Sequence, residues 1–136
     1  MPYLIAYVAA GLTFGALDAV WLTTMSNRLY KPVLGEILAP AVNLPAAAIF
    51  YLIYVFGIVT LAVEPGLRTG SMTRTVVAAA ILGGVAYATY DLTNQATLKV
   101  WSTRITVMDI GWGVFVTTAA AMAGLLAARW AARQFG

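Results

Sequence analysis

Cysteine and histidine are both absent from this chain of 136 residues. Their absence excludes disulfide bonds, thiol chemistry, zinc sites, haem held by histidine or cysteine, and di-iron sites built from glutamate and histidine. It also removes the commonest general base near neutral pH. A cation with oxygen ligands alone, such as Mg²⁺, stays open, but we assign no metal ligand and no cofactor. Any chemistry has to use Asp, Glu, Tyr, Lys, Arg or the backbone.

Charged residues are also scarce, at 10% of the chain against 62% hydrophobic residues, and the mean hydropathy is +0.86. A soluble domain carries about 25% charged residues. Because so few charges cannot cover a water-facing surface, we expect the lipid bilayer to be the solvent and first partner of this chain. The net charge of +3 comes from bases near the ends of apolar runs, which is typical of membrane proteins and does not indicate nucleic-acid binding.

Four apolar runs have the length of about 20 residues that a transmembrane helix needs. They predict spans at residues 3–25, 44–63, 72–92 and 106–128. The first run has no positive segment before it and no cleavage site after it, so we expect an uncleaved span rather than a signal peptide. The fold class is therefore an all-α integral membrane protein, a bundle of four transmembrane helices forming one domain over residues 1–136.

The connections between the spans differ in character. Asn43 and Ser71 are predicted to cap the second and third spans, and residues 64–66, Glu-Pro-Gly, are predicted to end the second. The two longer connections, residues 26–42 and 93–105, are each predicted to carry a short helix lying on the membrane surface.

Four spans place both termini on one side of the membrane, together with the short turn at residues 64–71. Basic residues are equally divided between the two sides, so the positive-inside rule does not decide the orientation. We expect cytoplasmic termini, because the α-amino group adds to that side and Arg129 and Arg133 flank the last span.

Small residues recur four positions apart in three of the spans, which lets helix backbones approach closely in lipid. This spacing favours tight packing within one bundle, and contact between two copies in a homodimer is the alternative. The pairs are Gly11 with Gly15, Ala79 with Gly83, and Ala120 with Gly124.

Three aspartates lie within or at the edges of spans, all towards the side with the longer connections: Asp18, Asp91 and Asp109. A charge near the centre of a bilayer costs about 2.5–3.5 kcal/mol or more, so such residues pair, carry a proton or serve a function. No base lies well inside a span. We therefore expect either that Arg28, Lys99 or Arg104 folds over the cluster or that the carboxyl groups are partly protonated.

The three aspartates are not equally informative. Thr106 and Asp109 have the spacing of a capping box at the start of the fourth span, where the helix dipole favours an acid. Asp91 lies in the last turn of the third span, where the dipole disfavours negative charge. Asp91 and Asp18 are therefore the stronger functional candidates, and Asp109 is predicted to be a helix cap.

Aromatic, amide and hydroxyl side chains accompany the aspartates. Asp18 with Trp21 and Asp109 with Trp112 repeat an i, i+3 spacing, which puts each pair on one helix face. The group is either a polar network that locks the helices together or a ligand-binding site, in which aromatic rings and carboxylates suit a cationic or amphipathic molecule. The candidate binding residues are Asp18, Trp21, Asn43, Tyr54, Tyr87, Tyr90, Asp91, Thr93, Asn94, Asp109 and Trp112.

Four motifs cover most of the chain: DAVWL at 18–22, NLPAAAIFYLIY at 43–54, YATYDLTNQATLKVW at 87–101 and DIGWG at 109–113. Together they resemble a bacterial membrane-protein family known as domain of unknown function 2177. The resemblance implies a four-span protein of the bacterial inner membrane and brings no activity with it. The residues that match the family pattern are Asp18, Trp21, Asn43, Tyr90, Asp91, Thr93, Asn94, Asp109, Trp112 and Gly113.

Three functions fit these observations. The first is binding or transport of an ion, a proton or an amphipathic small molecule by the polar cluster. The second is a membrane enzyme or accessory factor in lipid modification, although no nucleophile or cofactor motif supports it. The third is a structural subunit whose polar cluster latches it to other subunits of a membrane complex.

Overall fold

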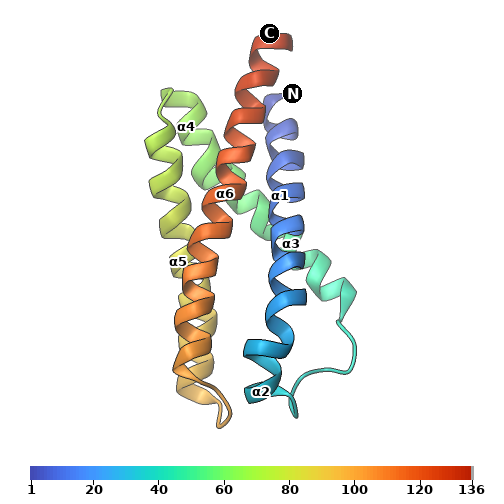
Figure 1. The fold of residues 1–136 in the computed structure, drawn as a ribbon. Helices are drawn as coiled ribbons and strands as arrows, with labels where there is room; N and C mark the ends of the chain where they lie inside the picture. The colour runs from blue at the N-terminus through green and yellow to red at the C-terminus, as the bar shows by residue number, and fades with distance from the viewer. Residues whose placement is uncertain (136) are drawn as a thin grey trace.

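The computed structural model describes residues 1–135, which form helices and no β-strand. They make four long helical stretches that stand as an all-α bundle, as the sequence predicts (Figure 1). Two stretches are single helices, and each of the other two contains a π-helical turn, labelled η. The elements are α1 (Pro2–Met25), η1 (Ser26–Tyr30), α2 (Lys31–Leu34), α3 (Leu44–Ile58), η2 (Val59–Val63), α4 (Glu64–Thr69), α5 (Met72–Thr97) and α6 (Thr103–Phe135).

Each stretch is long and apolar enough to cross a membrane, with 33, 26, 26 and 33 residues in chain order. At a rise of about 1.5 Å per residue the shortest is about 39 Å long, more than the bilayer's hydrocarbon core of about 30 Å. Large hydrophobic side chains such as Leu12, Ile53 and Val107 are exposed on the outer surface, where lipid would cover them. Both termini and the α4–α5 turn lie at one end, and the two longer connections lie at the other (Figure 1).

The starts of α3 and α5 are set by the side-chain caps that the sequence predicts. The Asn43 side-chain oxygen accepts a hydrogen bond from the backbone N–H of Ala46 at 3.2 Å, and Ser71 Oγ accepts one from the N–H of Arg74 at 3.2 Å. Each cap satisfies a backbone donor that has no partner inside its helix. Both predictions are confirmed.

The helix of the second span does not end at residues 64–66, where the sequence predicts the span to stop. The helix continues to Thr69 and ends at Gly70, whose φ of 69° is left-handed. The π-helical turn η2 ends two residues before Pro65, and the N–H of Glu64 is bonded five residues back to the oxygen of Val59. A wider turn at this point accommodates a ring that would clash within a regular α-helix. Pro32 follows η1 in the same way.

The surface helix predicted for residues 93–105 is also not found. α5 runs on to Thr97, and α6 already begins at Thr103, so only five residues connect them. Ser102 Oγ caps α6 by accepting from the N–H of Ile105 at 3.2 Å. In the polar last turns of α5 the threonine hydroxyls bond within the helix, as when the Thr97 hydroxyl donates to the Thr93 carbonyl at 2.8 Å. The 26–42 connection does carry helical residues, but they continue α1 as far as Leu34.

α6 is the central helix, packed against α5 on one side and α1 on the other (Figure 1). Glycine allows both contacts. A Cβ atom at Gly83 of α5 would collide with the carbonyl oxygen of Gly113, and one at Gly124 would come within 3.1 Å of the carbonyl oxygen of Ala6. Small residues in α5 and α6 therefore serve packing within the bundle. Gly15 differs, because nothing lies within 4 Å of its Cβ position.

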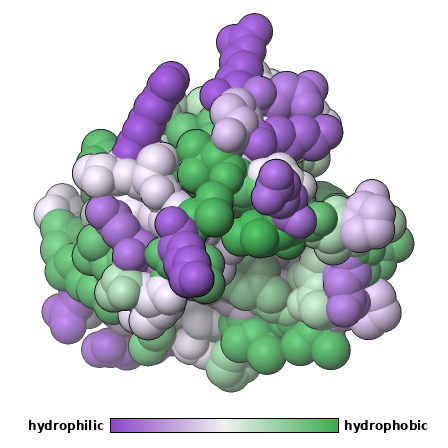
Figure 2. Space-filling model, turned by 90° about the horizontal axis from the view of Figure 1, so that it is seen from below, coloured by the Kyte–Doolittle hydropathy of each residue, from purple (hydrophilic) through white to green (hydrophobic). Residues whose placement is uncertain are grey.

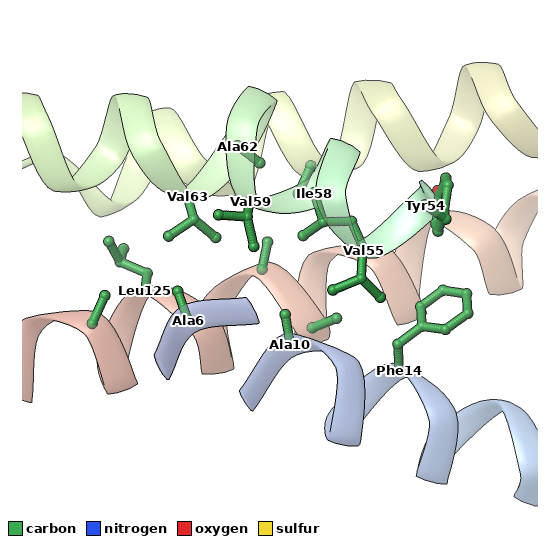
Figure 3. Close-up of a cluster of buried hydrophobic side chains, with 14 of the residues drawn as sticks. Ala6, Ala10, Phe14, Tyr54, Val55, Ile58, Val59, Ala62, Val63 and Leu125 are labelled. Atoms are coloured by element: carbon green, nitrogen blue, oxygen red, sulfur yellow. The ribbon is translucent and has the colours of Figure 1, made fainter. Parts of the chain in front are cut away.

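A hydrophobic core joins α1, the α3–η2 stretch and α6. Figure 3 shows its side chains, with the small residues Ala6 and Ala10 on α1 and with Phe14 and Tyr54 at one edge. The rings of Phe14 and Tyr54 lie 5.3 Å apart between centroids. α3 begins beside α1, on the side away from α5 and α6, and crosses the bundle obliquely. The same helical stretch ends with α4, which lies beside α5 (Figure 1). The bundle is therefore closed near the termini and splayed near the long connections.

Candidate functional site

A cavity of about 710 Å³ lies where the bundle splays, at the end that carries the long connections. Its wall includes side chains from all four helical stretches, from residues 38–42 and from Trp101. Figure 2 views this end of the molecule and shows hydrophilic side chains scattered among hydrophobic ones. Tyr54 belongs both to the cavity wall and to the hydrophobic core, so it marks the boundary between them.

Asp18 of α1 lies on one wall of the cavity and is 9% exposed. One carboxylate oxygen accepts a hydrogen bond from the hydroxyl of Tyr51 at 2.6 Å, and the other accepts a long one from Trp112 Nε1 at 3.4 Å. These donors come from α3 and α6, so three helices position this carboxylate. Hydrogen bonds to the charged form are the kind that stabilise a buried carboxylate.

Asp109 of α6 lies on the cavity wall and ends a second chain of hydrogen bonds. Trp21 Nε1 donates to the hydroxyl of Tyr30 at 2.9 Å, and Tyr30 donates in turn to the carboxylate of Asp109. The ring of Trp21 stacks on that of Trp112, with centroids 4.6 Å apart and planes 9° from parallel. Because Trp112 also donates to Asp18, the two carboxylates are joined through a pair of stacked indoles.

Asp91 of α5 lies behind this wall and is fully buried, at 0% exposure. Neither of its carboxyl oxygens has a hydrogen-bond donor among residues 1–135. Its carboxyl group is within hydrogen-bonding reach of that of Asp109. Two neighbouring acidic groups thus sit one behind the other, and only Asp109 is part of the cavity wall.

No base neutralises the three aspartates. Within residues 1–135 the only ion pair joins Arg68 to Glu64 at 2.9 Å, on α4. The sequence left two possibilities, a basic side chain folded over the aspartates or partly protonated carboxyl groups. The first of these is not found among residues 1–135. Lys31 is the one basic residue on the cavity wall, and it makes no ion pair within the described part of the chain.

Asp109 is not the helix cap that the sequence predicts. α6 begins at Thr103, two turns before Asp109, and Ser102 provides the cap. Thr106 instead takes part in a side-chain network, donating to Gln95 at 2.7 Å and accepting from Trp101 Nε1 at 3.0 Å. The capping prediction failed because the helix starts three residues earlier than the apolar run.

Seven of the eleven predicted site residues line the cavity: Asp18, Trp21, Tyr54, Tyr87, Tyr90, Asp109 and Trp112. The other four do not. Asp91 is buried behind the wall, and Asn43 caps α3. Thr93 donates to carbonyl groups of its own helix, and Asn94 is not part of the wall.

Sequence reasoning missed the two tyrosines that hold the carboxylates. Tyr51 stands in an aromatic stretch of α3 in which no pattern separates it from Phe50 or Tyr54. Tyr30 follows twelve residues after Asp18, and the π-helical turn η1 between them breaks the regular α-helical register. The proline at position 32 is the one signal for such an irregular turn.

The family comparison agrees with the resemblance seen in the sequence. The family model described as "Predicted membrane protein (DUF2177)" matches residues 3–126. The chain therefore belongs to this family of membrane proteins. Searches of curated proteins and of solved structures find no significant match.

Proposed function

We propose that this DUF2177 member binds an amphipathic small molecule with a cationic group in the cavity between its helices. The main observation is a cavity of about 710 Å³ whose wall carries Asp18 and Asp109 beside the stacked rings of Trp21 and Trp112. Neither carboxylate forms an ion pair with a basic residue in the described part of the chain.

The size of the cavity supports an organic ligand rather than a bare ion. Cavities that hold drug-sized molecules have volumes of about 300–1,000 Å³. The two wall carboxylates are also positioned by different partners on different helices, since Tyr51 donates to Asp18 and Tyr30 donates to Asp109. An arrangement of this kind suits a ligand that extends along the wall.

The chemistry of the wall supports a cationic group on that ligand. Carboxylates without a base in the protein attract positive charge, and the faces of aromatic rings add cation–π attraction. Besides the two tryptophans, the wall carries Phe50, Tyr87 and Tyr90.

The remaining wall supports an apolar portion of the ligand. Residues 38–42 contribute Leu38, Ala39, Ala41 and Val42 to the cavity. An apolar tail would lie against this segment, while the charged group reaches Asp18 and Asp109.

Binding of a probe tests this proposal. We expect the aromatic cation tetraphenylphosphonium to quench the tryptophan fluorescence of the protein in lipid nanodiscs. Asp18→Asn keeps the shape and an acceptor oxygen but removes the charge, and it should weaken binding tenfold or more, which corresponds to about 1.4 kcal/mol. Glu64→Gln, on α4 away from the cavity, is the matched control and should bind as the wild type does. Equal affinity of Asp18→Asn and wild type, with both folded, would rule the site out.

We further place the protein in a bacterial inner membrane with cytoplasmic termini, so that the cavity opens to the periplasm. Because the chain has no cysteine, single cysteines can report its orientation. A membrane-impermeant maleimide should label Glu36→Cys in intact cells and Arg68→Cys only after lysis. The reverse labelling pattern would show that the termini are periplasmic and would contradict the proposed orientation.

One observation favours a second function, in lipid modification. Lys31 adds an ammonium group to the wall that carries Asp18 and Asp109, so a zwitterionic lipid head group would find partners for both of its charges. This function predicts an altered lipid profile in a deletion strain, restored by the wild-type gene and not by Asp91→Ala. An unchanged profile would remove it.

A further inference from the structure

Asp91 is a buried acid with no donor to satisfy it. Its exposure is 0%, and among residues 1–135 neither carboxyl oxygen accepts a hydrogen bond from a donor group. The Asp109 carboxyl lies within hydrogen-bonding reach and is itself held by Tyr30. A buried polar group in this situation requires an explanation, because unsatisfied buried groups are rare in folded proteins.

The groups that face this pair are acidic or phenolic. Asp109 of α6 lies within hydrogen-bonding reach of Asp91, and Tyr30 of η1 and Tyr90 of α5 lie near both acids. Asp18 of α1 lies near Asp109. None of these groups can carry a compensating positive charge.

The other elements packed on α5 supply no base either. η2 and α4 contact α5 towards the opposite end, where Glu64 and Arg68 pair with each other. Lys99 and Arg104 flank the α5–α6 connection, but both are exposed and neither forms an ion pair in the described part of the chain. Lys31 of α2 lies on the cavity wall, whereas Asp91 does not.

Two ionised carboxylates in contact would repel each other, and burial away from water strengthens the repulsion. One proton held between them removes one charge and lets the protonated carboxyl donate to the other, which is a strong, charge-assisted hydrogen bond. We infer that Asp91 and Asp109 together form a proton-binding site that holds one shared proton at neutral pH.

The same site would couple ligand binding to proton release, a step that rests on the proposed function. Asp109 faces both the cavity and Asp91, so a cation bound in the cavity supplies the positive charge that the proton otherwise provides. The carboxyl O–H bond then breaks, its electron pair stays on the carboxylate, and the proton passes to water. One cation enters for each proton released.

Infrared spectroscopy of the wild type in nanodiscs tests the shared proton directly. We expect a protonated-carboxyl C=O band at pH 7 that shifts in D₂O and disappears in alkaline buffer. Asp91→Asn should remove this band, and Glu64→Gln should retain it. If Asp91→Asn does not fold, the pH dependence of the wild-type band still decides. Absence of the band from the wild type at pH 7 would overturn the inference.

Adding tetraphenylphosphonium tests the coupling. The band should vanish as the probe binds, and calorimetry in two buffers of different ionisation enthalpy should show one proton released per probe. Binding that leaves the band unchanged would overturn the coupling. An unquenched tryptophan signal with the band present would instead count against the proposed function and support the shared proton.

Discussion

The contact between α5 and α6 depends on Gly83, and Gly83→Ala tests how tightly it is packed. A Cβ at this position would collide with the carbonyl oxygen of Gly113 and lie 2.8 Å from Thr117 Oγ1. The obstacle is partly backbone, so α5 and α6 have to move apart. Gly84 offers a matched control on the next residue, because a Cβ there would lie 3.5 Å from Val114 Cγ2, an ordinary van der Waals contact.

The two variants separate packing from helix propensity. Alanine stabilises a helix by about 1 kcal/mol relative to glycine, and this gain applies to both positions. Overpacking costs about 1–3 kcal/mol and applies to Gly83 alone. Gly84→Ala should therefore be as stable as the wild type or up to about 1 kcal/mol more stable, while Gly83→Ala falls about 1–3 kcal/mol below Gly84→Ala.

Reversible unfolding in mixed micelles, followed by circular dichroism, measures this difference. The probe-binding assay adds a second reading, since Tyr87 lies one turn after Gly83 and lines the cavity. Gly83→Ala should also weaken binding of the probe, whereas Gly84→Ala should not. If both variants unfold with the same free energy, the close approach of α5 and α6 is refuted.

Three further predictions concern single contacts, each measured as the free energy of unfolding in the same micelles. Tyr51→Phe removes the 2.6 Å hydrogen bond to Asp18 and should cost about 1.5–3 kcal/mol, the range for a bond to a charged group; no loss would mean that this bond is not formed. Gly70→Ala forces an alanine to a φ of 69° and should cost about 1–2 kcal/mol, and a neutral result would contradict the left-handed helix end. Thr75→Val removes the buried 2.7 Å bond to the Ala62 carbonyl and should cost about 1 kcal/mol, and increased stability would show that the carbonyl does not need this donor.

Much of the fold follows from local sequence. Four apolar runs predict four spans, and the structure has four helices long and apolar enough to cross a membrane. Asn43 and Ser71 predict two helix starts because a cap depends only on residues within one turn. The predictions failed where local sequence signals for a helix end or a helix cap did not match the helix bounds in the folded protein. Residues 64–66 do not end the helix of the second span, since the π-helical turn before Pro65 lets the helix continue.

The candidate site is predictable in part for the same reason. Asp18 and Asp109 stand out in the sequence because a membrane span rarely tolerates a charge, and both line the cavity. Tyr30 and Tyr51 do not stand out, because a tyrosine becomes a hydrogen-bond donor to an acid only when another helix brings that acid within reach. Their partners are 79 and 33 residues away along the chain.

The sequence by itself determined that the lipid bilayer surrounds the chain, that four long helices form, and that the aspartates within them need partners. It could do so because hydrophobicity and charge are properties of short segments. Tertiary structure alone decided that α3 crosses the bundle obliquely and leaves a cavity of about 710 Å³ near the long connections. It alone decided that Asp91 lies behind Asp109 with no hydrogen-bond donor among residues 1–135. Both depend on how closely α5, α6 and α1 approach one another, and that distance is set by contacts such as Gly83 on Gly113 between residues far apart in the chain.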